Sequence, residues 1–234
     1  RLSAEQVVDS LFAAAGRPMD VEELTFDPDG RRTEGGRVNL GRPKRAWMLA
    51  NLANERDRPS LALPDAQAVT DVLEAFGWTG ARQNPRTDRD VASSVLQPGS
   101  LGNGVAATRL TRVADGGGLA ELALAATSPD ALVDSVFLRC LARFPTDLER
   151  APLASALAVG FADRLTPPNE LHPIAPPPAL PTVTWSNHLR AEANLAVLER
   201  ERRTRSGPPV DPRLRDAWRE RFEDVVWSVV NLPE

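Results

Sequence analysis

The sequence predicts a mainly α globular protein with several helices, long irregular loops and room for one short strand or hairpin. Apolar residues recur at helical spacing through most of the chain. Several of these runs begin after a capping residue and end at a glycine. Hydrophobic residues make up 42% of the 234 positions, which is enough to bury a core.

The first predicted element is a helix over residues 1–16. Ser3 can cap its start, Gln6 can reach back to the cap, and Gly16 can end it. Residues 17–44 hold several glycines, prolines and charges with little periodicity. They predict a long excursion over the surface.

The apolar run over residues 46–54 is too short for its periodicity to separate a strand from a helix. We favour a short strand there. A second helix is expected over residues 65–77, where Asp65 begins an apolar face of helical spacing and Gly77 supplies the end.

Three further helical segments cover residues 118–126, 128–144 and 146–164. The second has Ser128 as its cap and Pro129 at its first position. In the third, Thr146 and Glu149 have the spacing of a capping box.

Seven prolines fall within residues 166–182 and favour an extended linker or strap. Two helices are expected after it, over residues 185–207 and 211–231, the latter with Asp211 as its cap. The sequence therefore predicts three parts. They are a helical core domain over residues 1–165, the strap over 166–182, and a helical pair over 183–234 that packs back on the core.

The last helix presents an apolar face made of Trp218, Phe222 and Val226, with Trp227 beside them. We expect this face to pack against the first helix near Leu11 and Phe12, because each amphipathic helix needs a partner for its apolar side.

The composition argues against several classes of function. Lys and Arg number 28 against 32 Asp and Glu, so a net charge of −4 gives no positive field for nucleic acid. The longest apolar run, residues 119–126, is far shorter than the roughly 20 residues that cross a bilayer. One cysteine, Cys140, and two separated histidines offer no recognisable ligand set for a metal or for haem. We therefore expect no cofactor in this chain and an inert Cys140 that packs on the apolar face of its helix.

The stretch RTDRDVASSVLQPGSLGNG, residues 86–104, holds the candidate site. The candidate residues are all charged or amide side chains: Arg86, Asp88, Arg89, Asp90, Gln97 and Asn103. Three interpretations are open, namely a polar joint between helical layers, a ligand or partner loop, and a catalytic loop. The charges can pair among themselves, and the amides can bind a ligand or clamp a backbone turn.

Four segments together resemble a known family. They are RLSAEQVVDSLFAAAG, NPRTDRDVASSVLQPGSLGNG, LVDSVFLRCLARFPTDLER and WRERFEDVVWSVVNLPE, in this order. The chain resembles the planctomycete cytochrome-c-associated C-terminal domain of unknown function. The resemblance implies a large exported bacterial protein, periplasmic or in the cell envelope. In such proteins this domain follows a companion domain, and haem binds a separate N-terminal cytochrome-c-like module.

We expect a non-catalytic interaction or scaffold module that packs on the companion domain. That module would position a redox or carbohydrate-processing partner, and no nucleic acid is expected. The alternative is part of an extracellular enzyme acting on polysaccharide, with a site completed by an N-terminal region outside this sequence.

Overall fold

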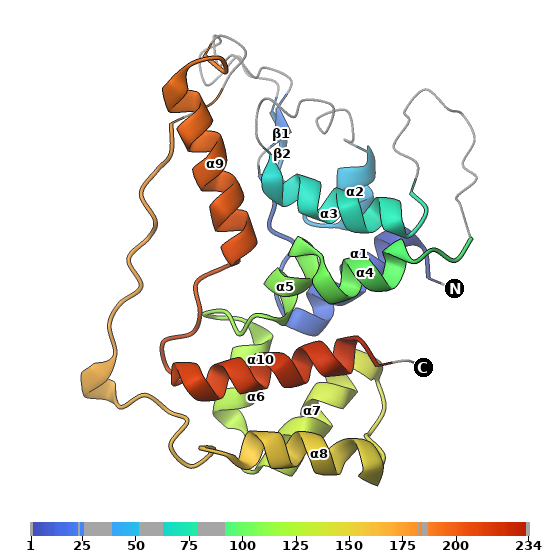
Figure 1. Cartoon of the computed structure of the whole chain (residues 1–234), viewed down its shortest axis with the longest axis vertical. Helices are drawn as coiled ribbons and strands as arrows, with labels where there is room; N and C mark the ends of the chain where they lie inside the picture. Colours follow the sequence, from blue (N-terminus) through green and yellow to red (C-terminus); the bar gives the residue numbers. More distant parts are fainter. Residues whose placement is uncertain are drawn as a thin grey trace. The chain divides into compact units, whose positions relative to one another are not determined.

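A computed structural model describes residues 2–22, 24–25, 39–51, 63–78, 92–181, 183 and 187–232 of the chain (Figure 1). Its helices are α1 (Ala4–Ala15), α2 (Ala46–Asn51), α3 (Pro64–Ala75), α4 (Leu96–Asn103), α5 (Val105–Thr111), α6 (Gly118–Ala125), α7 (Pro129–Leu141), α8 (Asp147–Ala158), the 3-10 helix η4 (Pro168–Glu170), α9 (Ala191–Ser206) and α10 (Asp216–Val230). The two short strands β1 (Leu24–Thr25) and β2 (Asn39–Gly41) pair antiparallel. The predicted mainly α fold is confirmed. Within the described ranges, no helix combines the length and the apolar character that a bilayer span requires.

Contacts divide the chain into two compact units. Unit 1 holds residues 1–10, 18–106 and 177–206, and unit 2 holds residues 11–17, 107–176 and 207–234. The contacts of α9 therefore fall in unit 1 and those of α10 in unit 2. The predicted domain boundaries at residues 165 and 182 stay a prediction.

In unit 1, α3 packs against α2, α4 and α9. One face of α3 is apolar and buried, as its spacing predicts, and Gly77 follows the helix with a φ of +89°. On α9 the buried face is made of small residues, among them Ala193 and Ala196. Thr204 Oγ1 of α9 donates a hydrogen bond of 2.7 Å to Asp65 Oδ1 of α3. Apolar packing and this polar contact together join the two helices.

The end of the proline segment is held by arginines of α9. Arg203 donates to the carbonyl of Pro178 at 2.9 Å, and Arg200 donates to that of Pro181 at 2.8 Å. Prolines lack N–H groups, so a proline-rich backbone offers acceptors that need outside donors. The last residues of the predicted strap are therefore attached to unit 1.

The strand favoured over residues 46–54 is wrong, because residues 46–51 form the helix α2. Asp9 Oδ1 of α1 accepts the Ala46 N–H at 3.0 Å and so satisfies a free donor at the start of α2. Ala46 and Leu49, one helical turn apart, are both buried. A distant side chain and tertiary packing decide between the two structures that this short apolar run allows.

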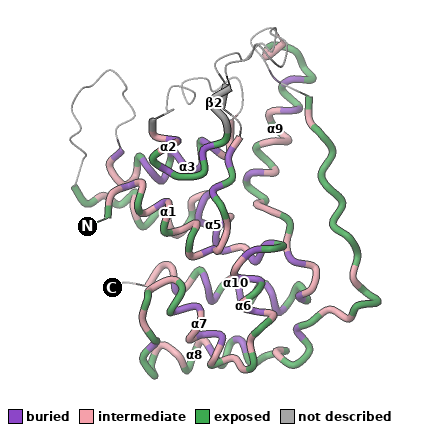
Figure 2. The backbone as a smooth tube through the Cα atoms, turned by 180° about the vertical axis from the view of Figure 1, so that it is seen from behind, coloured by how far each residue is buried: buried purple, intermediate pink, exposed green. Residues whose placement is uncertain are grey.

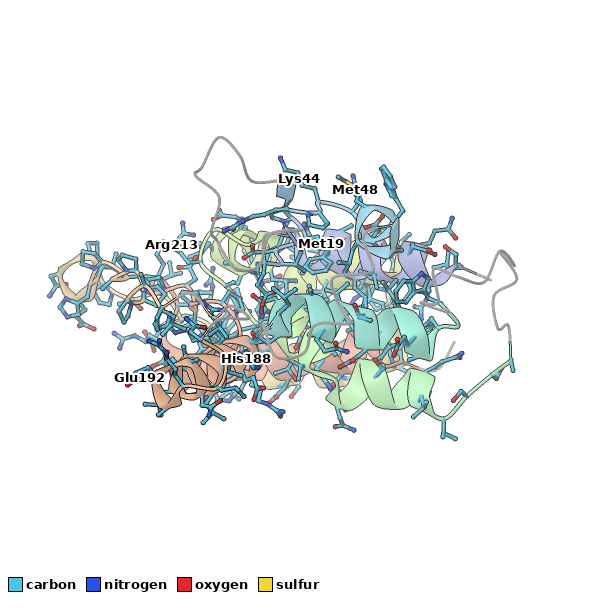
Figure 3. All side chains as sticks on the ribbon, turned by 90° about the horizontal axis from the view of Figure 1, so that it is seen from above. Met19, Lys44, Met48, His188, Glu192 and Arg213 are labelled. Atoms are coloured by element: carbon cyan, nitrogen blue, oxygen red, sulfur yellow. The ribbon has the colours of Figure 1, made fainter. Side chains whose placement is uncertain are left out.

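Residues 17–44 are also not wholly a surface excursion. Met19 and Val21 are buried, and β1 and β2 lie within this range. In Figure 3, Met19 lies among the ribbons, whereas the exposed Lys44 and the half-buried Met48 lie nearer the outer edge.

Glu22 caps the first turn of α3. Its two carboxylate oxygens accept the Asp65 and Ala66 N–H groups, each at 2.8 Å. Burial and the neighbouring charge of Asp65 raise the pKa of Glu22 to about 7. Glu22 therefore changes its charge near neutral pH, and it does so while it caps the start of α3.

In unit 2, α7 packs on α6, α8 and α10 around one apolar core. Figure 2 shows buried residues along the facing sides of these helices. The predicted caps of α7 and α8 are confirmed. Ser128 Oγ accepts the Ala131 N–H at 3.1 Å, and Thr146 with Glu149 forms a capping box. The helix predicted over 146–164 ends earlier, at Ala158, and Gly160 follows with a φ of +77° that a continuing helix cannot use.

The predicted start of the last helix is wrong, because α10 begins at Asp216 and Asp211 does not cap it. Residues 209–215 instead form a loop with a turn at residues 212–213, and on either side of this turn Val210 pairs with Ala114 and Leu214 pairs with Leu165 in isolated antiparallel bridges. Asp211 is fully buried and accepts from Arg213 Nη2 at 2.6 Å.

The apolar face of α10 is buried, but only part of it packs where the sequence predicted. Trp218 Nε1 donates to the Leu157 carbonyl at the end of α8 at 3.0 Å, and its ring contacts Phe161 and Phe222. Only the later part of the face, at Val226, lies beside the end of α1. The apolar spacing of α10 is compatible with packing on α1 or on α8. The large side chain of Trp218 packs at the end of α8.

Arg164 joins three helices of unit 2 from a buried position. It is 8% exposed and donates to the carbonyls of Ala123 at 3.0 Å and Ala126 at 2.7 Å, at the end of α6. It also donates to the Phe161 carbonyl at 3.0 Å, just after α8. Its guanidinium lies 4.0 Å from the ring centroid of Phe161 and 5.9 Å from that of Trp218 on α10. One side chain thus satisfies the last carbonyls of one helix and packs between two others.

We predict that Arg164→Met lowers the free energy of unfolding by about 3 kcal/mol, because buried carbonyls lose charged donors that methionine cannot replace. Urea denaturation measures the loss. Arg221→Met is the matched control, since Arg221 donates to the Val159 carbonyl at 3.0 Å from an exposed position. The control should change stability by no more than about 0.5 kcal/mol. Equal effects of the two substitutions would contradict the role given to Arg164.

We also predict that Glu22 makes unit 1 less stable as the pH rises. The pKa of Glu22 is about 7 when folded and 4.5 ordinarily, so the folded state binds more protons between these values. Its contribution is complete below pH 4.5 and is lost as the pH rises through 7, by about 3 kcal/mol at roughly 1.4 kcal/mol per pKa unit. Chemical denaturation of the wild type and of Glu22→Gln between pH 4.5 and 8 measures this. The substitution should flatten the profile, and parallel profiles would show that Glu22 does not titrate in this range.

Candidate functional site

Four of the six residues proposed from the sequence lie outside the described residues. They are Arg86, Asp88, Arg89 and Asp90, within residues 79–91. Their role, and with it the alternative of an enzyme site that includes them, stays a prediction. Gln97 and Asn103 are the two that the structure places.

Gln97 and Asn103 lie on the helix α4, so this part of the candidate stretch is helical and is not a loop. Pro98 falls within the first turn of α4, where a backbone N–H has no helical partner to lose. Gln97 Nε2 donates to the Ala92 carbonyl at 3.3 Å and so fixes the start of the helix. Asn103 is the last residue of α4, about 9 Å further along the axis at 1.5 Å per residue. The structure therefore does not bring the two amides together at one site.

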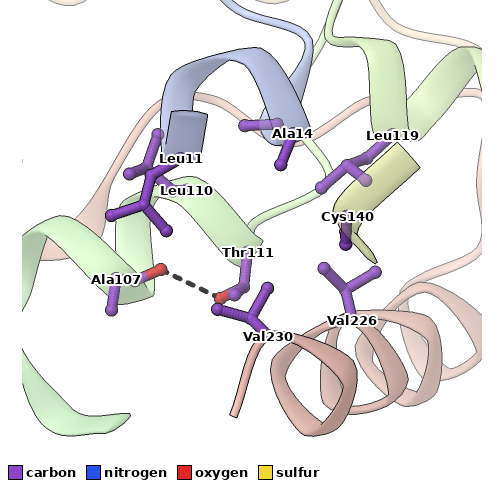
Figure 4. A pocket seen from close by; sticks show the side chains of 10 residues that line it. Leu11, Ala14, Ala107, Leu110, Thr111, Leu119, Cys140, Val226 and Val230 are labelled. Atoms are coloured by element: carbon purple, nitrogen blue, oxygen red, sulfur yellow. Dashed lines mark hydrogen bonds between the residues drawn. The ribbon is translucent and has the colours of Figure 1, made fainter. Parts of the chain in front are cut away.

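Cys140 lines a small cavity in unit 2 (Figure 4). The cavity measures about 10 Å³ and is walled mainly by apolar side chains, among them Leu11 and Val226. Thr111 turns its hydroxyl away to the Ala107 carbonyl at 3.2 Å. Burial raises the pKa of the Cys140 thiol to about 11, so it stays protonated at neutral pH. This space is a packing gap beside an unreactive thiol, too small for an organic ligand.

The two histidines are far apart in sequence and surroundings. His172 is exposed in the segment after η4, and His188 lies in the turn before α9, close in sequence to Glu192 (Figure 3). In the part of the chain that the structure describes, no group of three or more His, Cys, Asp or Glu side chains could hold a metal ion.

A cleft of about 640 Å³ opens in unit 2, and we call it the Arg112 cleft. One wall is the segment 166–174, which includes η4, and the floor is the segment 209–216 that leads into α10. Arg112, which follows α5, completes the lining. No local sequence pattern indicates this cleft, because its residues come from three separate segments.

Backbone hydrogen bonds fix the floor of the Arg112 cleft on both sides. On one side, the Asp211 N–H donates to the Val113 carbonyl at 3.0 Å. On the other side, the Arg215 N–H donates to the Arg164 carbonyl at 2.8 Å, and the Thr166 N–H donates to the Arg213 carbonyl at 2.9 Å. The loop that forms the floor is therefore held at two points, on one side by the segment after α5 and on the other by the segment after α8.

A second feature of unit 2 is the turn after α7 together with the first three residues of α8, residues 142–149, which we call the Phe144 turn. Arg143 donates to both carboxylate oxygens of Glu149, at 2.8 and 3.0 Å. Glu149 also accepts the Thr146 N–H at 2.7 Å. The bonds from Arg143 and Thr146 lower the pKa of Glu149 to about 2, so this carboxylate stays ionised. The turn is thus locked by its own side chains.

Two large apolar side chains point outward from the Phe144 turn. Phe144 is 61% exposed and Leu148 is 90% exposed. The capping box of this turn is visible in the sequence. Its exposed apolar residues are not, because a helical pattern does not tell which apolar residues stay outside the core.

A family model described as PSD1, protein of unknown function (DUF1553), matches residues 1–157. The match covers more than half of the chain, so the protein belongs to this family of unknown function. No curated protein and no solved structure matches the chain. The expected resemblance to a domain family of unknown function is confirmed. The planctomycete and cytochrome-c associations go beyond this match and stay expectations.

Proposed function

We propose that this member of the DUF1553 family is a non-catalytic interaction module of a larger exported bacterial protein. In the proposal it packs on a companion domain of the same polypeptide, in the periplasm or the cell envelope. There it positions a redox or carbohydrate-processing partner, while haem belongs to separate cytochrome-c-like modules. The Phe144 turn is the observation that carries the proposal.

The Phe144 turn has the properties of a protein-binding anchor. Binding energy in protein interfaces concentrates in a few large side chains that bury fully in the complex, and aromatic residues are prominent among them. Phe144 and Leu148 offer such side chains and contribute little to the core of unit 2, because most of their surface is exposed. Single exposed apolar residues are ordinary, but here two of them lie on one locked turn.

Rigidity makes these exposed residues effective. Ordering a flexible loop on binding costs free energy, and a loop that is already ordered avoids that cost. The ion pair of Arg143 with Glu149 and the capping box hold the turn before any partner arrives. The same bonds pair the charges of Arg143 and Glu149 with each other, while the carboxylate of Asp147 beside Leu148 is exposed. An apolar patch on the companion domain therefore fits the side chains of Phe144 and Leu148.

We predict that Leu148 is covered by the companion domain in the full-length protein. A Leu148→Cys substitution places a thiol there, and Cys140 gives little background because its thiol is half-buried and protonated. Alkylation of the full-length protein, followed peptide by peptide with mass spectrometry, should label position 148 at least about tenfold more slowly than an exposed thiol.

Thr127→Cys is the matched control. Thr127 is exposed and precedes α7, so it lies at the far end of that 13-residue helix from the Phe144 turn, about 20 Å away. Position 127 should react at the rate of a free surface thiol. Equal alkylation rates at positions 127 and 148 would contradict the docking proposal. Catalytic turnover of the full-length protein that is lost through changes confined to this chain would overturn the non-catalytic assignment.

A further inference from the structure

We propose that the Arg112 cleft binds a small organic oxoanion, in which a carboxylate, sulfate or phosphate is carried on an apolar body. The guanidinium of Arg112 is the counter-ion of the anionic group. This site lies apart from the Phe144 turn in sequence and chemistry, so the inference does not rest on the docking proposal.

Arg112 has unused hydrogen-bonding capacity at the cleft. Its Nε is buried without a hydrogen-bond partner, and its guanidinium forms no ion pair with a described residue. A guanidinium carries five N–H donors in a planar fork that matches the oxygens of carboxylate, sulfate and phosphate. Arg219 also has a buried Nε without a partner, but its Nη atoms pair with Asp216 and Glu223 and it does not line the cleft. Buried polar groups are nearly always satisfied in native proteins, so the unpaired guanidinium of Arg112 in the cleft lining indicates a missing acceptor.

The backbone around Arg112 holds its side chain in place. Gly207 has a φ of +73°, and a Cβ at this position would lie 3.2 Å from Cδ of Arg112. Glycine therefore leaves the room that the arginine stem occupies. With its stem packed on the backbone, the guanidinium stays at the cleft instead of extending freely into solvent.

The other charged side chains of the cleft already have counter-ions. Arg215 Nη2 lies 3.8 Å from Glu170 Oε2 across the cleft lining. Asp216, in the first turn of α10, pairs with Arg219 at 3.1 Å and thereby occupies the anionic position at that helix end. Of the two arginines in the cleft lining, Arg215 therefore has a carboxylate partner, and Arg112 has none among the described residues.

Carboxylates behind the cleft do not supply that partner. Glu223 Oε1 accepts the Val113 N–H and a bond from Arg219 Nη1, each at 2.8 Å. Asp211 is fully buried against Arg213. Both carboxylates are thus committed to other donors, so neither of these described residues supplies an acceptor for Arg112.

The uncharged lining sets the nature of the rest of the ligand. Ile174, Pro209 and Pro212 form an apolar part of the wall, and the prolines bring no N–H donors. Exposed His172 adds one donor at the rim. The volume of about 640 Å³ falls in the range of small-molecule sites, roughly 300–1,000 Å³. An organic anion with a single charged group matches this lining better than inorganic sulfate or a neutral sugar.

Isothermal titration calorimetry on the purified 234-residue chain at low salt tests the site. The probes are benzoate, benzenesulfonate and phenyl phosphate, with neutral benzamide and inorganic sulfate as comparisons. At least one aromatic anion should bind at least tenfold more tightly than either benzamide or sulfate. The best of the three identifies the anionic group. Binding of none of the three, or equal binding of sulfate, would overturn the proposal.

Two variants place the binding in the cleft. Arg112→Gln should weaken binding of the best probe at least tenfold, whereas Arg221→Gln, at an exposed arginine outside the cleft lining, should leave it unchanged. Ile174→Glu is a second test that does not touch Arg112. Ile174 is 38% exposed, so the fold tolerates the change, and the new carboxylate should compete for Arg112 and abolish binding. Wild-type affinity in Ile174→Glu would show that the probes bind elsewhere.

Discussion

The guanidinium of Arg164 is the constraint on which the structure of unit 2 depends. Its side chain satisfies the last carbonyls of α6 and packs between the rings of Phe161 and Trp218. The backbone of the same residue accepts the Arg215 N–H, and its neighbour Thr166 donates to the Arg213 carbonyl. Arg164 therefore joins the helical core to the loop that forms the floor of the Arg112 cleft. A buried charge is retained here because its fork reaches several acceptors at once, which no apolar side chain can do.

Charged side chains from distant segments complete helix ends in both units. Asp9 satisfies the start of α2 and Glu22 the start of α3. Arg139 Nε donates to the Ala14 carbonyl at the end of α1, at 2.6 Å. These hydrogen bonds join helix ends to segments that are distant in the sequence. Arg112 and Arg219 each have a buried Nε without an acceptor among the described residues, but only Arg219 also forms ion pairs, with Asp216 and Glu223. The contrast supports a ligand in that cleft, whereas the locked Phe144 turn supports a protein partner.

The parts of the fold that could be predicted depend on neighbouring residues. Thr146 and Glu149 are three residues apart, so their capping box is visible in the sequence and is confirmed. The start of α10 could not be predicted, because Asp211 has the features of a cap but is held by bridges to segments about 50 to 100 residues earlier. The helix α2 depends on Asp9 in the same way. Of the candidate residues, Gln97 and Asn103 lie apart on α4 and do not form one site. Arg112 could not be predicted as a site residue, because its cleft forms only when three separate segments come together in the folded chain.

Hydrogen–deuterium exchange of the wild-type chain tests most directly whether the loop at residues 209–215, before α10, is fixed by its two bridges. The decisive amides are those of Asp211 and Arg215 in that segment and of Thr166 beside it, each of which donates to a backbone carbonyl. The account predicts that they exchange at least about a hundredfold more slowly than the amides of exposed His172 and Ile174 in the opposite wall. Equal exchange of the amides in the floor and in the wall would show that the bridges open freely. That result would contradict the claim that the backbone near Arg164 fixes the floor of the cleft.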